Sequence, residues 1–370
     1  MNDYFPLGLA SNEAFCNRKQ ERDHVLSNIK LGKPTLIVSP RRYGKTSLVL
    51  KAVQESKLPY SHIDFFSEIN QKELISSILK GIGIAIGKIA KTHQRAIKAV
   101  KEFFLGTQIK FSIDTSVISV EFEIEPENMK DRLKTILMRF DDLAKKNNKK
   151  VILFFDEFQR LGQIVEDHSI EAILRQIAQQ SKNIVFIFSG SNRHLLSQIF
   201  DDRRRPFYKL CDRIVLERIE YDHYNNHIQE ASIEKWRKKL EENIIKLILF
   251  LTERHPYYVN LLCSRIFLFL KLPKEQDVNL IWDKIALEEK SQLALEMDLL
   301  SDNQRILLIT LAKIGKSREL LNKTFTMQAG LSPSSIAQSL AVLQKRDYIY
   351  KDKEGFYDLI DPLLRRIIKL

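Results

Sequence analysis

A short segment near the N-terminal end carries groups suited to binding phosphate. Residues 39–46 read SPRRYGKT; an apolar run, residues 35–38, precedes them, and a helix-forming run, residues 47–53, follows. A strand, a tight loop ending in Gly-Lys-Thr and a helix form a P-loop (Walker A), whose backbone N–H groups cradle phosphate oxygens. The Lys45 ammonium would then reach the β- and γ-phosphates of a nucleotide, and the Thr46 hydroxyl would bind Mg²⁺.

The loop departs from the usual pattern at its first position, where Ser39 stands in place of glycine. Glycine eases the first bend of such a loop, so we expect Ser39 to adopt a more ordinary φ. The nucleotide-binding residues that this segment predicts are Pro40, Arg41, Arg42, Tyr43, Gly44, Lys45, Thr46 and Ser47.

Two adjacent carboxylates end a strongly apolar run later in the chain. Residues 151–155 are all apolar and precede Asp156 and Glu157. Five unbroken apolar residues predict a strand buried on both faces, as in a parallel sheet. Unpaired charge at such a strand end is costly, and a cation beside it is the simplest explanation. We expect Asp156 to hold Mg²⁺, directly or through water, and Glu157 to polarise an attacking water, which is a Walker B pattern.

Small polar residues end another buried strand, predicted at residues 183–188. Their side chains would lie beside the Asp-Glu strand and face a γ-phosphate, and Ser191 and Asn192 are the candidates; an ordinary turn is the alternative. Farther along, residues 201–205 read DDRRR. These arginines could approach a γ-phosphate from the same or a neighbouring chain, and a solvated charged loop is the alternative.

The predicted elements divide the chain into three parts. Residues 1–220 alternate strands with helices, which predicts an α/β parallel-sheet core with an insert at about 81–128. Residues 81–87 read GxGxxxG, but the spacing is wrong for a dinucleotide-binding turn and no strand directly precedes it. Residues 221–300 are helical in pattern and form a candidate lid. Residues 301–370 predict helices at 303–314, 318–329 and 332–345 and then a hairpin, which is a winged helix-turn-helix.

Composition narrows the class of protein. The 370 residues are 44% hydrophobic and 29% charged, which predicts a folded chain, and the net charge of +12 favours an anionic partner. Cys16, Cys211 and Cys263 are far apart, so neither a disulfide framework nor a zinc site is indicated. The first residues lack a basic region and a long apolar core, and no apolar stretch is long enough to span a bilayer. We therefore expect a cytoplasmic protein without a signal peptide or transmembrane segment.

Together these motifs resemble the archaeal-type ATPase family, within the STAND class of AAA+-related P-loop NTPases. The family shares an N-terminal Phe-x-Gly-Arg element, a PRRxGKTSL loop, strands ending in Asp-Glu and Gly-Ser, a lid helix with a His-Pro step, and a winged helix ending in Asp-Pro-Leu. The matching stretches in this sequence are residues 15–18, 39–48, 151–159, 186–191, 255–257 and 361–363. The likeness covers nearly the whole chain.

The resemblance implies further site residues. Asn17, Arg18 and Pro256 would border the adenine and sugar of ATP, and Ser191 and Asn192 would occupy the position of a sensor 1. The family's Tyr-Gly-Arg after the sensor strand is replaced here by Tyr-Lys-Leu, so the usual arginine is either missing or moved to Arg213, which is the candidate. Asn17 also stands where the family has glycine. These departures predict slow hydrolysis more than weak binding.

Three functions are compatible with the sequence. The first is a nucleotide-dependent switch, an ATPase in which ATP–Mg²⁺ closes the lid and winged helix onto the core and slow hydrolysis resets it. The second is a DNA-binding regulator or loader that reads a duplex through residues 334–345, although few long basic side chains occupy that helix's first turns. The third is a scaffold that binds nucleotide without hydrolysing it. Winged helices of this class also contact proteins, and STAND proteins often assemble on activation, so a protein partner or a nucleotide-dependent homo-oligomer is possible.

Overall fold

The computed structural model of the protein describes residues 3–10, 12–90, 92–105, 107, 109–114, 119–123, 129–352 and 354–369. Contacts divide the chain into two compact units. The core unit comprises residues 18–39 and 45–216, and the C-terminal unit comprises residues 1–17, 40–44 and 217–370. The segment 40–44 of the P-loop thus belongs, by its contacts, to the C-terminal unit. The division into three domains at 220 and 300 stays a prediction.

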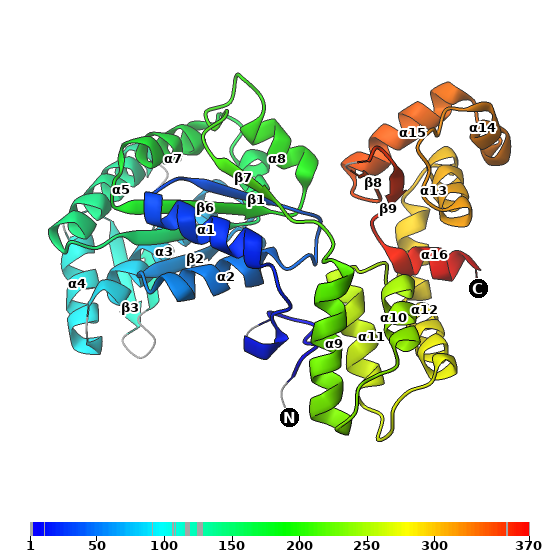
Figure 1. Ribbon diagram of the computed structural model, residues 1–370. Helices are drawn as coiled ribbons and strands as arrows, with labels where there is room; N and C mark the ends of the chain where they lie inside the picture. The colour runs from blue at the N-terminus through cyan, green and yellow to red at the C-terminus, as the bar shows by residue number, and fades with distance from the viewer. Residues whose placement is uncertain are drawn as a thin grey trace. The chain divides into compact units, whose positions relative to one another are not determined.

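A five-stranded parallel sheet with the order β2-β5-β6-β1-β7 forms the centre of the core unit (Figure 1). Its strands are β1 (Thr35–Val38), β2 (Tyr60–Asp64), β5 (Val151–Asp156), β6 (Ile184–Gly190) and β7 (Asp212–Val215). The helices of this unit are α1 (Lys19–Leu31), α2 (Lys45–Ser56), α3 (Gln71–Ile89), α4 (His93–Leu105), α5 (Met129–Lys146), α6 (Gln159–Ile164), α7 (Ser169–Gln180) and α8 (Arg193–Phe200). Because β6 lies between β1 and β5, the polar end of β6 is next to both the P-loop strand and the Asp-Glu strand.

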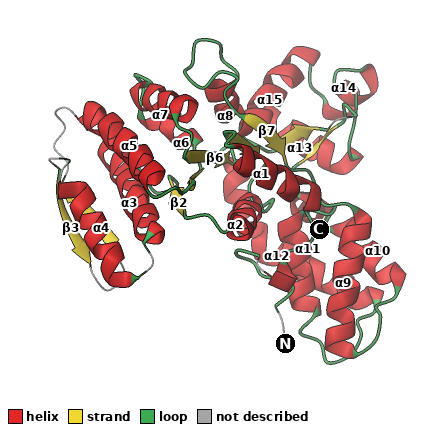
Figure 2. Ribbon diagram, turned by 60° about the vertical axis from the view of Figure 1, so that its left-hand side comes forward, coloured by secondary structure: helices red, strands yellow, loops and turns green. Residues whose placement is uncertain are grey.

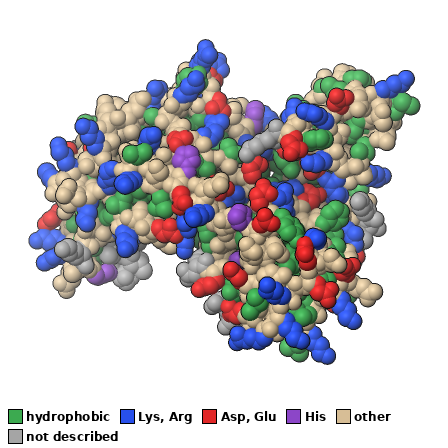
Figure 3. Space-filling model, in the orientation of Figure 1, with side chains coloured by type: hydrophobic (Ala, Val, Ile, Leu, Met, Phe, Trp, Pro, Cys, Tyr) green, Lys and Arg blue, Asp and Glu red, His purple; other side chains and the backbone are tan. Residues whose placement is uncertain are grey.

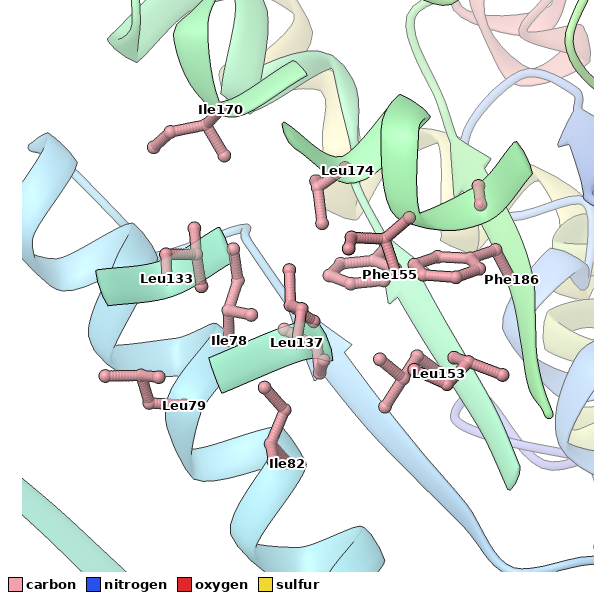
Figure 4. Packing of buried hydrophobic residues seen from close by; sticks show 14 of the residues in the cluster. Ile78, Leu79, Ile82, Leu133, Leu137, Leu153, Phe155, Ile170, Leu174 and Phe186 are labelled. Atoms are coloured by element: carbon pink, nitrogen blue, oxygen red, sulfur yellow. The ribbon is translucent and has the colours of Figure 1, made fainter. Parts of the chain in front are cut away.

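Helices cover both faces of the sheet, with α1 and α2 on one face and α3, α5 and α7 on the other (Figures 1 and 2). Successive side chains of β5 point to opposite faces of the sheet, and both faces are covered, which explains its unbroken run of apolar residues. Leu153 and Phe155 pack with α3, α5 and α7 in one apolar cluster (Figure 4), whereas Ile152 and Phe154 are equally buried but lie outside that cluster. A strand covered on both faces has no polar positions to offer solvent, so the predicted parallel α/β core is confirmed.

The glycine-rich segment 81–87 lies inside α3 and not in a phosphate-binding turn. A Cβ placed at Gly81 would overlap the side chain of Ile63 on β2 and lie 3.1 Å from Ser61 Oγ. Glycine at this position therefore allows α3 to approach the sheet closely. Within the predicted insert, after α4, β3 (Lys110–Asp114) pairs antiparallel with β4 (Ser119–Glu123), and the turn between them lies outside the described residues.

In its described residues, the C-terminal unit is helical except for one small hairpin. The 3₁₀ helix η1 (Asn12–Ala14), α9 (Tyr221–Trp236), α10 (Glu242–Leu251), α11 (Pro256–Ile266) and α12 (Glu275–Asp298) precede the winged helix. The winged helix consists of α13 (Asp302–Ile314), α14 (Lys323–Ala329), α15 (Pro333–Lys345), β8 (Ile349–Lys351), β9 (Tyr357–Leu359) and α16 (Pro362–Lys369). None of the helices in the described part of the chain is long and apolar enough to cross a bilayer.

One predicted helix of the winged domain was too long. The helix predicted at 318–329 begins only at Lys323, because the side chain of Asn322 accepts a hydrogen bond from Phe325 N at 2.8 Å and caps it. The residues before the cap follow another course, and Ser317 pairs with Tyr357 of β9. An Asn N-cap satisfies a free N–H of the first turn and so favours a helix start there. The last helix, α16, was not predicted.

Candidate nucleotide-binding site

The P-loop joins β1 to α2 with two residues in the left-handed region, Arg42 at φ 64° and Gly44 at φ 83°. Ser39 is not among the residues of positive φ, as expected from its side chain, and it is fully buried. The non-glycine conformation at Arg42 costs on the order of 1 kcal/mol. Lys45 is buried, and its Nζ donates a hydrogen bond to the Ser39 carbonyl at 3.3 Å. The lysine ammonium therefore lies folded against the start of its own loop.

Asp156 lies at the centre of a cluster of hydroxyl donors. Thr46 Oγ1 donates to Asp156 Oδ2 at 2.6 Å, and Ser189 Oγ on β6 donates to Oδ1. His62 Nε2 lies 3.5 Å from Oδ2. Burial alone would raise the pKa of Asp156, but the approach of His62 and the hydrogen bonds from Ser189 and Thr46 outweigh it and lower the pKa to about 2. The carboxylate is thus held ionised although only 4% of the residue is exposed.

Glu157 is oriented by two other donors. Its backbone has φ 50°, and its Oε2 accepts hydrogen bonds from Ser191 Oγ at 2.7 Å and from Gln159 Nε2. Gly190 makes room for this contact, because a Cβ there would overlap Gln159 Oε1. The predicted pair Glu157 and Ser191 is therefore brought together. The side chain of Asn192 accepts from Leu195 N at 3.0 Å and caps α8, and its role toward a nucleotide stays a prediction.

The surroundings of Asp156 fit a hydrated divalent cation. His62 Nε2, 3.5 Å from Asp156 Oδ2, is buried and has no hydrogen-bond partner among the described residues, so an ordered water around an ion would satisfy it. Asp64 pairs in register with Asp156, and its pKa is raised by burial and by the charges of Asp156 and Glu157. In the described part of the chain no three His, Cys, Asp or Glu side chains form a metal cluster. Thr46 and Asp156 are the residues that would hold Mg²⁺, an ion that keeps several of its waters when bound to protein.

The side chains of the P-loop also make contacts within the C-terminal unit. The Arg42 guanidinium lies 4.0 Å from the centre of the Tyr257 ring, and Tyr43 packs edge-on against His255 with ring centres 4.8 Å apart. Pro256 occupies the first turn of α11, as predicted from the His-Pro step. Burial, followed by the charge of nearby Arg218, lowers the pKa of His255 to about 3, so its imidazole is neutral.

Arg218 forms hydrogen bonds with several distant segments, and the sequence did not predict it as a site residue. Its guanidinium donates to Tyr43 Oη at 3.4 Å, to Glu253 Oε2 at 2.7 Å and to the carbonyl oxygens of Leu359 and Ile360 at 3.2 and 3.4 Å. One arginine thus joins a P-loop side chain, the turn before α11 and the end of the wing. No sequence signal distinguishes it from neighbouring arginines, because its partners are distant in the chain.

The remaining predicted residues are placed as follows. Asn17 and Arg18 both have positive φ, 52° and 66°, and Arg18 is buried with its Nη1 3.0 Å from Glu21 Oε1. Arg41 is exposed. Arg213 is paired in register with Leu36, two residues before the end of β1, and its Nη2 lies 2.6 Å from Asp201 Oδ1. The roles of these residues toward a nucleotide stay predictions.

Two parts of the sequence match models of known protein families. Residues 35–207 match the model of the ATPase family associated with various cellular activities (AAA), and residues 294–369 match that of a probable winged helix domain. Residues 35–207 thus form an AAA-type domain, and residues 294–369 form a winged helix domain. The matched ranges include both the Walker motifs and the wing, so the recognition made from the motifs is confirmed at this level.

Solved structures share the fold of this chain. The Walker-type ATPase PABY2304 of Pyrococcus abyssi superimposes with a TM-score of 0.69 at 15% identity, over 99% of this chain and 100% of that one. The ORC2 protein of Aeropyrum pernix, in ADPNP–ADP complexes, gives a TM-score of 0.58 at 14% identity, over 99% and 96%. Identities this low show the fold alone. No curated protein matches the sequence significantly.

Proposed function

We propose that this protein is a nucleotide-dependent molecular switch of the STAND type, which binds ATP with Mg²⁺ and hydrolyses it slowly. The observation that carries the proposal is the cluster beneath the P-loop, in which His62, Ser189 and Thr46 hold the buried Asp156 ionised. A buried, ionised carboxylate next to a P-loop threonine has a clear use in holding a cation beside phosphates. Bound Mg²⁺ would neutralise charge on the phosphate oxygens.

The chain's own residues have separable tasks in this proposal. The backbone N–H groups of the loop and the Lys45 ammonium bind the phosphates, and Lys45 must exchange its bond to the Ser39 carbonyl for a phosphate oxygen. Glu157 orients the attacking water, and the donors Ser191 and Gln159 fix its Oε2 and leave Oε1 to accept from that water. The donors limit the carboxylate's freedom, which fits the expectation of slow turnover.

The contacts between the P-loop segment 40–44 and the rest of the C-terminal unit support the proposed switch. Residues 40–44 belong to the C-terminal unit, and the contacts of Tyr43 with Arg218 and His255 extend from this loop to the turn before α11 and to the wing. Nucleotide that orders this loop therefore acts on a segment packed with the lid helices and the winged helix. A binder that only stored nucleotide would not need this connection.

Turnover and binding measured on the same variants test the proposal. We expect Glu157→Gln to bind ATP with unchanged affinity and to lose phosphate release, because only the group facing the water is changed. Glu166→Gln is the matched control, since Glu166 is an exposed acid nearby and should leave both quantities unchanged. Full phosphate release by Glu157→Gln would remove Glu157 from the mechanism. A chain that neither binds nor hydrolyses ATP would overturn the proposal as a whole.

DNA binding through the winged helix is the second candidate, favoured by the match of residues 294–369 to a winged helix domain. The exposed positions in the first turns of α15 are Pro333, Ser334, Ala337, Gln338 and Ala341, which carry no charge. Sequence-independent contact with phosphates would instead need Lys345 and Arg346 at the end of the helix. A protein partner at the wing is the other use of such a neutral surface.

We also propose a cytoplasmic location and nucleotide-dependent self-association. Cys16, Cys211 and Cys263 are all free thiols, which fits a reducing compartment. The proposal of self-association rests only on the resemblance to STAND proteins, which often assemble on activation. Size-exclusion chromatography with and without a slowly hydrolysed ATP analogue tests it, and an elution volume that nucleotide does not change would contradict it.

A further inference from the structure

A groove of about 360 Å³ lies in the core unit, outside the nucleotide-binding cluster. One wall is a single face of α7, where Ala172, Arg175, Gln176 and Gln179 follow each other at helical spacing. The other wall is residues 203–206, in the loop between α8 and β7. In Figure 3 the projection that this loop forms at the top of the core unit carries Lys and Arg side chains.

A buried ion pair fixes the loop against α7. Glu171 is fully buried, and Arg205 donates to both of its carboxylate oxygens, with Nε 3.1 Å from Oε2. Arg205 Nη1 also lies 3.1 Å from His168 Nε2. The charge of Arg205 is therefore neutralised by Glu171 and holds the loop in place. Because Glu171 is one turn before Arg175, the same pair sets the position of the groove's two walls.

The other arginines of the groove keep charge for a ligand. Arg204 is strongly exposed, but Asp202 accepts from its Nε at 3.1 Å and from its Nη2 at 2.8 Å, so part of its charge is already neutralised. Arg175 and Arg203 have no carboxylate partner among the residues that the structure describes. Residues 18–39 and 45–216 contain 33 Lys and Arg against 23 Asp and Glu, so the core unit carries 10 of the chain's 12 net positive charges.

The chemistry of the lining selects the class of ligand. Every cation in the groove is arginine, whose planar fork binds phosphate oxygens in pairs, and Gln176 and Gln179 add neutral donors of the kind that also contact phosphates. No aromatic side chain lines it, so it offers no surface on which the bases of a single strand would stack. It also lacks the large apolar residues that would enter a membrane.

We propose that this arginine groove binds the phosphate backbone of duplex nucleic acid without sequence preference. This contact goes beyond the switch proposed above and uses neither the P-loop nor α15. Each phosphate contact contributes a slope of about −0.9 to the dependence of log affinity on log salt, which corresponds to about eightfold in affinity between 1 M and 0.1 M salt. Loss of two contacts should therefore weaken binding roughly 60-fold at 0.1 M salt.

The test is fluorescence anisotropy of the full chain with a labelled mixed-sequence duplex, over a salt series. We expect Arg175→Gln/Arg203→Gln to weaken binding roughly 60-fold at 0.1 M salt and to reduce the salt slope by about two. Lys145→Gln/Lys146→Gln removes the same charge from the exposed end of α5 and should change affinity by less than about twofold. Both double variants change exposed or half-buried side chains, and their melting temperatures and ATP affinities should match the wild type.

Three results would overturn the proposal. The first is equal loss of affinity in the groove variant and in the α5 control, which would mean a diffuse charge effect. The second is loss confined to Lys345→Gln/Arg346→Gln, which would assign the duplex to the winged helix. The third is competition by polyglutamate as strong as that by unlabelled duplex of equal charge, which would make an acidic protein the ligand. None of these outcomes depends on whether the P-loop binds ATP.

Discussion

The titration of His255 is a prediction whose size follows from the surroundings of the side chain. His255 is the N-cap residue of α11 without a side-chain capping hydrogen bond, is 3% exposed, and its imidazole lies edge-on to Tyr43. Burial and the charge of Arg218 lower its pKa from about 6.5 to about 3. In the unfolded chain the same side chain is solvated and titrates near its ordinary pKa of about 6.5.

The consequence is a loss of stability on acidification. Below pH 6.5 the unfolded chain binds a proton at His255 and the folded chain does not, so the free energy of unfolding falls as pH falls, down to the folded pKa. Between pH 7.5 and pH 5 the difference is about 1.5 pH units at 1.36 kcal/mol each, or about 2 kcal/mol. At pH 7.5 His255 is neutral in both the folded and the unfolded chain, so none of this stability is lost.

Urea unfolding of the wild type and of His255→Asn at both pH values measures this difference. Asparagine does not titrate in this range and is a good N-cap, so the variant keeps the helix start. We expect the wild type to lose about 2 kcal/mol more than the variant between pH 7.5 and pH 5. A histidine NMR signal that is absent from the variant and still neutral at pH 5 would support the same conclusion. Equal pH dependence of the two proteins, or a His255 signal that titrates near 6.5, would refute the reasoning.

Three other predictions follow from packing and from the site. Gly81→Ala should lower the free energy of unfolding by about 1–3 kcal/mol, because the new Cβ overlaps Ile63, and a melting temperature equal to or above the wild type's would contradict this. Phe158→Leu should cost about 1–2 kcal/mol in urea unfolding, since its buried ring packs 4.6 Å from the Phe188 ring; an unchanged midpoint would argue against a tightly packed cluster. Ser191→Ala should lower kcat for ATP about tenfold with KM unchanged, because one donor that orients Glu157 is lost, and an equal change in both constants would indicate a binding role instead.

The strands of the sheet and the ends that carry chemistry could be predicted from the sequence, and for a physical reason. A strand buried on both faces must be continuously apolar, so the polar residues after Val38, Phe155 and Phe188 mark the edge where the strands end. The same argument places Asp156 and Thr46 at one edge, where they meet. The fold class followed from these runs and from the helices between them.

What the sequence could not show depends on contacts between distant segments. Ser189 was read as part of a polar strand end, yet it donates to Asp156 because β6 is inserted between β1 and β5. The partners of Arg218 are spread from Tyr43 to Ile360, so nothing local marks it. Arg175 and Arg203 face one groove only because the pair of Arg205 and Glu171 fixes the loop on α7. The misplaced start of α14 shows the converse, since its asparagine cap was visible in the sequence.

Isothermal titration of ATP in the presence of Mg²⁺ tests the central claim most directly. The buried ammonium of Lys45 is the group that must move onto the phosphates, so Lys45→Ala should weaken ATP binding by about 100-fold. Lys51→Ala, farther along the same helix, is the matched control and should bind as the wild type does. Equal affinity of Lys45→Ala and the wild type would contradict the assignment of this loop as the nucleotide site.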